Sequence, residues 1–256
     1  MNAPHRTGGK PPSSAAAIRN PNGLDQPHVA ASAEPGGLAR NHEPEINLAI
    51  LPRTPPAAVL RGATDFGQRQ QGRSLACAVP LRDDDDSARR QLLAELYAET
   101  SVAERSPVAR GLRAFFTDVA EQAVLFRQVA RRFPDAGRDG SVRLRLDRVD
   151  DGMCRAFHTD CYRMRMICTY HGAGTEWTPN ANVKRAEMYS LPPEDRLHDA
   201  ELRYQLQTGW LAILKGEHFH EGAHRSEGAM GNEAIVHRSP TAVPGQWRLI
   251  LRVDCD

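Results

Sequence analysis

The period of the hydrophobic residues changes near residue 142. Before it, apolar residues between Leu112 and Val129 recur at helical spacing, which predicts an amphipathic helix. After it, Val142, Leu144 and Leu146 alternate with charged residues, which predicts a strand buried on one face. Short apolar runs separated by turn residues continue almost to the C-terminus. We therefore expect an α+β domain whose helices come first and whose antiparallel sheets come second.

The helical part is predicted to span about residues 87–133. Four consecutive aspartates precede its first helix, where acidic side chains cap the chain and suit the helix dipole. Leu92 and Leu96 belong to the apolar stripe of that helix. Ser106 and Pro107 have the residue types of a cap and a first helical position, so they predict the start of a second helix. Both helices are expected to pack against a sheet.

Residues 1–45 are rich in Pro, Gly, Ala, Ser and Asn and contain few bulky apolar side chains. Such a segment buries too little apolar surface to offset the entropy of ordering, so we expect a disordered tail. Residues 46–256 are expected to form a single domain that includes the helical part.

The formal net charge of +1 gives no electrostatic reason to expect binding to nucleic acid or to an anionic membrane. No apolar run reaches the roughly 18–20 residues that cross a bilayer. Five unevenly spaced cysteines favour reduced thiols over a disulfide framework. These features predict a cytoplasmic protein.

A His-x-Asp motif lies at residues 158–160. On an extended segment His158 and Asp160 point to the same side, because side chains alternate along a strand. His237, 79 residues later, is the candidate third ligand of a 2-His-1-carboxylate metal site. Such a site leaves metal positions open for a co-substrate and dioxygen, as non-haem Fe(II) oxygenases require.

Arginines on the last predicted strand could complete this site. Arg248 follows His237 by eleven residues and shares one strand face with Ile250 and Arg252. The planar guanidinium can bind a carboxylate through two parallel hydrogen bonds. Tyr170 is a further candidate for lining the pocket and contacting the co-substrate. The alternative for the arginines is a strand edge with solvated side chains.

Two other groups could bind metal. One has the residue types of a zinc site: Cys154, His158, Cys168 and His171. The other lies in a glycine-rich stretch and could form a substrate lid or an exposed loop: His218, His220 and His224.

The order of these motifs resembles the Fe(II)/2-oxoglutarate-dependent oxygenases, and in particular their prolyl-hydroxylase-like branch. This resemblance implies a double-stranded β-helix, or jelly roll, buttressed by the N-terminal helices. It places His158, Asp160 and His237 at the positions of the metal ligands and Arg248 at that of the co-substrate clamp. It further implies a hydroxylase whose small-molecule or protein substrate is unknown.

Residues 46–254 also resemble DUF1826, a bacterial family named only as a domain of unknown function. The resemblance lies in five short motifs: Phe157–Asp160, Cys168–Tyr170, Gly174–Trp177, Leu214–Glu217 and Val236–Pro240. Members of this family tend to be associated with zinc-responsive systems. A non-enzymatic jelly-roll protein that stores, delivers or senses zinc is therefore the alternative. The oxygenases usually have a small hydroxyl residue where this chain has Ile250, which is a departure that bears on Arg248. Arg252 is the competing clamp because it shares the face of Arg248 one strand repeat further on.

Overall fold

The computed structural model describes residues 22–70, 74–81, 84–103, 106–133, 141–150, 154–219 and 234–256. The described α-helices are α1 (Ala57–Arg69), α2 (Asp85–Glu99) and α3 (Pro107–Ala130). The strands of the large sheet are β1 (Val29–Ala31), β2 (Leu48–Leu51), β3 (Ser74–Pro80), β4 (Ser141–Val149), β5 (Met164–His171), β8 (Leu211–Lys215) and β10 (Arg248–Cys255). Those of the small sheet are β6 (Glu176–Trp177), β7 (Tyr204–Gln205) and β9 (His237–Arg238).

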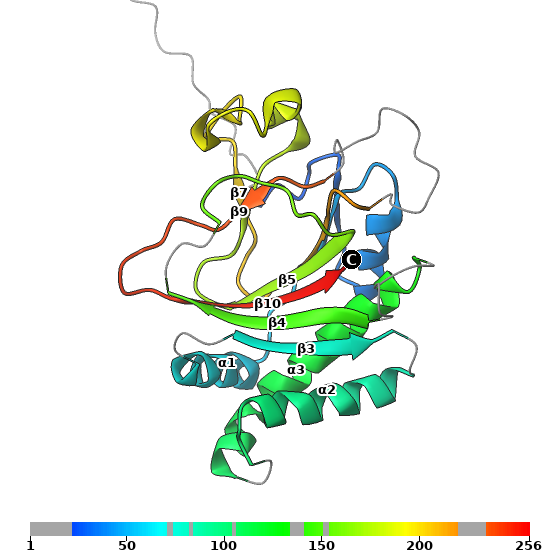
Figure 1. The fold of residues 1–256 in the computed structure, drawn as a ribbon, viewed down its shortest axis with the longest axis vertical. Helices are drawn as coiled ribbons and strands as arrows, with labels where there is room; N and C mark the ends of the chain where they lie inside the picture. Colours follow the sequence, from blue (N-terminus) through cyan, green and yellow to red (C-terminus); the bar gives the residue numbers. More distant parts are fainter. Residues whose placement is uncertain are drawn as a thin grey trace, which may run out of the picture.

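The strand order is that of a jelly roll. The large sheet runs β1-β2-β8-β5-β10-β4-β3, and the small sheet runs β7-β6-β9 (Figure 1). An isolated antiparallel bridge between His158 and His237 adds a fourth, very short strand next to β9. From β4 onward the chain passes repeatedly from one sheet to the other. The strands β8, β5, β10 and β4 of the large sheet therefore face a second sheet, which consists of the bridge, β9, β6 and β7. Two four-stranded antiparallel sheets connected in this way form the double-stranded β-helix that we expected.

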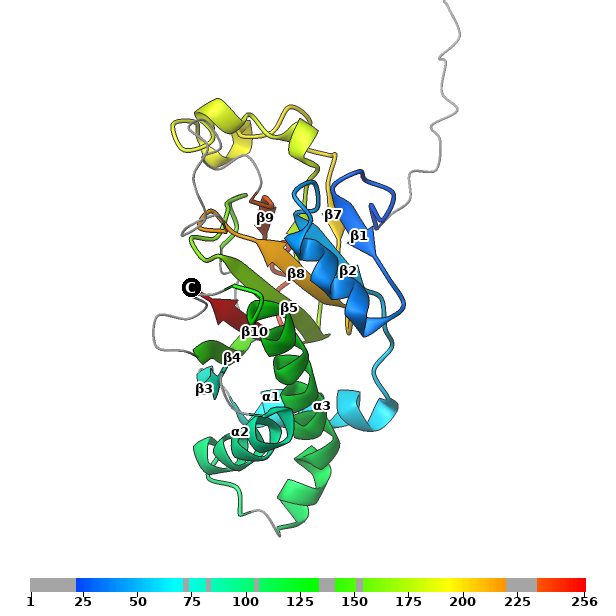
Figure 2. The same ribbon diagram turned by 90° about the vertical axis from the view of Figure 1, so that its right-hand side faces the viewer.

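The three α-helices cover the face of the large sheet that is turned away from the small sheet (Figures 1 and 2). Apolar residues of α1 and α3, including Phe66, Phe115 and Phe116, form one core with every second residue of the central strands. As predicted, α2 and α3 begin at capped positions: Asp84 accepts a hydrogen bond from the backbone amide of Ser87, and Ser106 accepts one from that of Ala109. The α+β class is therefore confirmed.

The expectation of a disordered tail up to residue 45 is wrong for the described residues 22–45. Val29–Ala31 pair in parallel with Leu48–Ile50 of β2, and Pro35–His42 form a 3-10 helix. Leu38 on that helix is fully buried in the core against the large sheet. A few apolar residues are enough to order this segment, because they pack against the edge of the large sheet. Residues 1–21 lie outside the described part of the chain.

Two elements between residues 57 and 80 had no clear pattern in the sequence. Helix α1 contains glycines and alanines, and Gly62 lies where a Cβ would come within 2.9 Å of Phe115 Cβ. The glycine therefore lets α1 approach α3 closely. Strand β3 pairs with β4 at the sheet edge.

Short 3-10 turns cover the outer face of the small sheet: Asn180–Asn182, Arg185–Glu187 and Pro193–Asp195 (Figure 1). Their apolar residues Val183 and Met188 pack with Phe157 and Val236. Phe157 immediately precedes the His-x-Asp motif, so this layer holds the motif in place. No helix in the described ranges is long and apolar enough to cross a membrane.

Candidate metal centre

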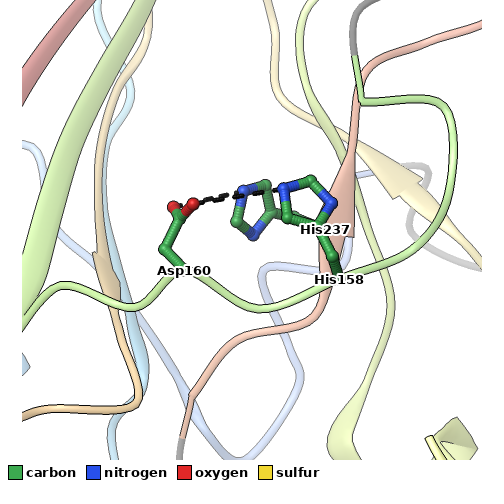
Figure 3. A group of neighbouring side chains, drawn as sticks. All are labelled: His158, Asp160 and His237. Carbon is green, nitrogen blue, oxygen red and sulfur yellow. Dashed lines mark ion pairs between the residues drawn. The ribbon is translucent and has the colours of Figure 1, made fainter. Parts of the chain in front are cut away.

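His158, Asp160 and His237 meet between the two sheets (Figure 3). One ligand atom from each residue lies within 4.8 Å of the others. His237 Nε2 is 3.4 Å from Asp160 Oδ2, and His158 Nε2 is 4.0 Å from Asp160 Oδ1. The bridge between His158 and His237 joins their backbones through two hydrogen bonds of 3.0 Å. The sheet pairing thus brings together side chains that are 79 residues apart.

Both imidazole rings present Nε2 toward the carboxylate. His158 Nδ1 lies 2.9 Å from the carbonyl oxygen of Ala156, and His237 Nδ1 lies 3.3 Å from that of Ile235. A carbonyl oxygen only accepts, so Nδ1 carries the proton and Nε2 keeps its lone pair. Hydrogen bonds of this type orient the histidines of metal sites.

The protonation of His237 agrees with this assignment. Burial lowers the pKa of His237 to about 4, although the nearby Asp160 carboxylate favours the charged ring. The ring is therefore neutral at pH 7. Its Nε2 lone pair faces Asp160 Oδ2, which is buried and accepts no hydrogen bond from the described residues. Two lone pairs directed at each other repel, and a cation between them removes the repulsion.

The other carboxylate oxygen is held by an arginine. Arg165 on β5 donates from Nη1 to Asp160 Oδ1 at 2.8 Å. The same guanidinium donates from Nε and Nη2 to the two oxygens of Asp254 on β10, at 2.5 and 3.1 Å. All three residues are buried. Two carboxylates and one guanidinium leave one negative charge in the interior, which is costly unless a cation compensates it. The residues present therefore fit a bound metal dication.

A pocket of about 510 Å³, including the open space at its mouth, adjoins the triad. Its walls include Val149, Ile167 and Ile250 from the large sheet and Thr175 and Ser239 from the small-sheet side. The apolar walls and the few polar groups are suited to orienting one ligand beside the metal ligands.

Arg248 lies at the first position of β10, beyond the hydroxyl groups of that pocket. It donates to the carbonyl oxygen of Ala173 at 2.6 Å, to Ser239 Oγ at 3.2 Å and to Thr175 Oγ1 at 3.5 Å. Within the described ranges it forms no ion pair. Burial lowers the pKa of Arg248 to about 10, only partly opposed by Glu176. The hydrogen bonds of Arg248 thus go to neutral acceptors, and the nearby Glu176 forms no ion pair with it.

Arg252 lines the pocket itself but is already paired. Its Nε and Nη2 donate to Asp147 Oδ2 at 2.9 and 2.5 Å. Ser74 donates to the other oxygen of Asp147 at 2.5 Å, which fixes the carboxylate. As expected, Arg248, Ile250 and Arg252 share one face of β10, and the pairing of Arg252 leaves Arg248 as the cation open to an anionic ligand.

The assignment of Tyr170 to the co-substrate pocket is wrong. Tyr170 lies on the opposite face of β5, in the core formed with the helices. Its hydroxyl donates to Asp118 Oδ2 at 2.5 Å, and its ring packs edge-on against Phe115. Burial raises its pKa well above the usual value. Strand β5 is buried on both faces, and the side chain of Tyr170 lies on the face that packs against the helices. Tyr170 is therefore a structural residue.

The proposed cysteine-histidine zinc set does not come together. Among the described residues, the triad is the one group of metal-binding side chains that converges. Cys168 lies in the core beneath the helices, and His171 stacks on Trp247 with ring centroids 3.8 Å apart. Cys154 instead lines the pocket beside the triad. Of the second histidine group, residues 220 and 224 lie outside the described ranges.

The sequence interpretation missed Arg165, Asp254, Thr175 and Ser239. In the sequence, Arg165 and Asp254 look like exposed charged residues of two strands. Thr175 and Ser239 were missed because hydroxyl residues near turns are common. The available signal was position: Arg165 lies five residues after Asp160, on the strand that follows the motif. An arginine inside a strand that is otherwise buried needs a carboxylate partner.

The fold and the site define a jelly-roll protein with an internal 2-His-1-carboxylate cluster. The chain belongs to the family described as "Protein of unknown function (DUF1826)", which matches residues 32–254. This confirms the family resemblance seen in the sequence. The chain matches none of the curated proteins in sequence.

Several solved structures are similar in overall shape. The dioxygenase for auxin oxidation 1 from Arabidopsis thaliana, in a 2-oxoglutarate complex, is 11% identical, with a TM-score of 0.46 and coverage of 88% of this chain and 91% of that chain. Neurospora crassa T7H with alpha-KG and 5-formyluracil is 12% identical, with a TM-score of 0.45 and coverage of 87% and 76%. A Pseudomonas putida prolyl-4-hydroxylase is 11% identical, with a TM-score of 0.38 and coverage of 86% and 97%. The jelly-roll assignment rests on the strand order described above.

Proposed function

We propose that this protein is an Fe(II)- and 2-oxoglutarate-dependent oxygenase that hydroxylates its substrate. The observation that carries the proposal is the distribution of charge along the pocket. At one end the buried triad region has one negative charge in excess. Next to the pocket, Arg248 contacts the lining residues Thr175 and Ser239; it has a positive charge and forms no ion pair in the described part of the chain.

A metal dication at the triad would change the charge of that end from negative to positive. The pocket would then lie between two positive charges, the metal and Arg248, because the lining residues Arg252 and Arg238 are paired with Asp147 and Glu176. 2-Oxoglutarate has a carboxylate at each end. One carboxylate and the adjacent keto oxygen can bind at the metal, while the far carboxylate reaches the cation. A dianion of this shape therefore matches the charges that the protein provides.

The residues have distinct parts in this function. His158, Asp160 and His237 would hold the metal and leave part of its surroundings open to ligands. When bound, Fe(II) supplies the capacity to bind and activate dioxygen for oxidation of the substrate. Arg248 would bind and orient the far carboxylate through its planar fork. Ile167 and Ile250 would exclude water from the space between.

A zinc-binding protein for metal storage, delivery or sensing is the rival function. The same three ligands bind zinc more tightly than iron by raw affinity, so metal content alone does not decide. A zinc carrier has no need for a half-buried Arg248 that lies beside the pocket without an ion pair among the described residues. Co-substrate binding therefore separates the two functions.

The test is anaerobic addition of Fe(II) and 2-oxoglutarate, followed by the weak visible charge-transfer band of the chelate. We expect the band in the wild type and its loss in Asp160→Ala and His237→Ala. His171→Ala is the matched control, because His171 belongs to the cysteine-histidine set but lies away from the triad, and it should keep the band. Metal binding without any 2-oxoglutarate binding would refute the oxygenase and support the zinc protein.

A further inference from the structure

A buried salt-bridge chain, Asp254–Arg165–Asp160, connects the last strand to the candidate metal site. The three nitrogens of the Arg165 guanidinium donate hydrogen bonds to two carboxylates, which come from different parts of the chain. Asp254 lies on the final strand, whereas Asp160 is the carboxylate of the candidate triad. The last strand thereby contacts the metal site indirectly.

The geometry divides the two oxygens of Asp160 between two partners. Oδ1 accepts from Arg165 Nη1 at 2.8 Å, while Oδ2 is buried, faces His237 Nε2 and accepts no hydrogen bond within the described part of the chain. An oxygen that accepts a short charge-assisted hydrogen bond is a poorer and less accessible metal ligand. Asp160 is therefore set to offer a single oxygen, Oδ2.

Arg165 cannot turn away from Asp160 easily. Asp254 binds the Nε and Nη2 edge of the guanidinium through both carboxylate oxygens, at 2.5 and 3.1 Å. The planar geometry of arginine then fixes the direction of Nη1. The ring of Tyr162 lies against the same guanidinium, 4.6 Å from its carbon to the ring centroid. These contacts leave one orientation for the donor that reaches Asp160.

We propose that Arg165, oriented by Asp254, is a positioning residue that keeps Asp160 a single-oxygen ligand and so preserves an open place on the metal. This inference rests on the proposed metal centre and adds a requirement to it. A carboxylate bound through both oxygens would occupy one of the places that a co-substrate or dioxygen needs. Asp254 would thus influence the metal although it does not contact it.

The test uses Co(II) as a probe of affinity and coordination under anaerobic conditions. Arg165→Lys retains the charge but has no planar fork that can reach both carboxylates. Asp254→Asn leaves Arg165 in place and weakens its anchor, so it remains informative if Arg165→Lys does not fold. We expect both variants to lower Co(II) affinity by roughly 10–100-fold, measured by competition with a chelator. We also expect a changed intensity of the visible Co(II) bands, which depends on coordination number.

The matched control is another buried arginine-carboxylate pair on the opposite face of the sheet. Arg53 donates to Asp118 from Nη1 at 2.7 Å and from Nη2 at 2.9 Å. Arg53→Lys should lower the melting temperature and leave both the Co(II) affinity and the Co(II) spectrum unchanged. A purely structural role for Arg165 would give the same pattern.

The outcomes separate the two proposals. If wild-type protein binds Co(II) and both Arg165→Lys and Asp254→Asn match it in affinity and spectrum, the positioning role is wrong while the metal centre stands. If wild-type protein binds neither Co(II) nor Fe(II), the metal centre itself is refuted, and the positioning role with it.

Discussion

Replacing Arg248 by glutamine should abolish most of the affinity for 2-oxoglutarate and leave metal binding intact. The substitution removes the charge but keeps a side chain that can still donate to the carbonyl oxygen of Ala173, which Arg248 contacts at 2.6 Å. The triad is contributed by other strands, so the metal should not be affected. The loss should therefore be specific to the co-substrate.

The size of the effect follows from the environment of Arg248. Burial lowers its pKa well below the usual arginine value, to about 10, which corresponds to a free-energy cost of about 3 kcal/mol for keeping the charge at this site. A bound carboxylate would recover up to that amount. Charge-assisted hydrogen bonds contribute about 1.5–3 kcal/mol, which gives the same upper value. The dissociation constant should therefore rise by roughly 10–150-fold.

The assay is titration of 2-oxoglutarate into the anaerobic Fe(II) protein, by calorimetry and by the visible band. Arg252 provides the comparison, tested as the double variant Arg252→Gln with Asp147→Asn so that no buried charge is left unpaired. This double variant should change the affinity by a few-fold or less. Wild-type affinity in Arg248→Gln, or a large loss only in the double variant, would refute the assignment of the clamp to Arg248.

Three further predictions follow from buried groups. Burial, with a contribution from Arg185, lowers the pKa of His28 to about 4. Below about pH 6.5, His28 is protonated in the unfolded chain but stays neutral in the folded chain down to about pH 4. The free energy of unfolding is therefore highest above pH 6.5 and falls by about 3 kcal/mol between pH 6.5 and 4. Urea unfolding across that range should show a flatter profile in His28→Gln, and an unchanged profile would contradict the prediction. Tyr170→Phe removes the hydroxyl that donates to Asp118, so the free energy of unfolding should fall by about 1.5–3 kcal/mol while the affinity for 2-oxoglutarate stays unchanged. A lower affinity at unchanged stability would instead show that Tyr170 contacts the co-substrate. Gly216→Ala would place a Cβ 1.9 Å from a backbone oxygen next to the His-x-Asp motif, so melting temperature and metal affinity should both fall, whereas Gly36→Ala, with open space around it, should change neither.

The elements with a regular hydrophobic period could be predicted from the sequence. Helix α3 and strand β4 each show one apolar face, and the structure uses that face against the common core. The segment at residues 22–45 was missed because its burial depends on a partner strand and not on its own composition. Leu38 is buried only because β2 and β8 provide a surface for it.

The triad could be predicted because its ligands follow a recognisable spacing, whereas its supporting residues could not. Arg165 and Asp254 are 89 residues apart, and nothing in their local sequence links them. Tyr170 was misassigned for a different reason. Strand β5 is buried on both faces, so its sequence lacks the alternation that would show which side chains face the helices.

The backbone around Arg248 explains how strand β10 can provide both the proposed clamp and part of the core. The pairing of β10 with β5 shifts between Leu249 and Ile250, and such irregularities re-aim side chains near functional sites. Gly172, at the end of β5, has φ of +80°, and a Cβ there would lie 2.5 Å from the carbonyl oxygen of Trp247. The glycine thus lets the start of β10 approach the turn whose carbonyl oxygen at Ala173 holds Arg248. The position of Arg248, the proposed clamp, therefore depends on this turn as much as on the strand, whereas Leu249 stays in the core.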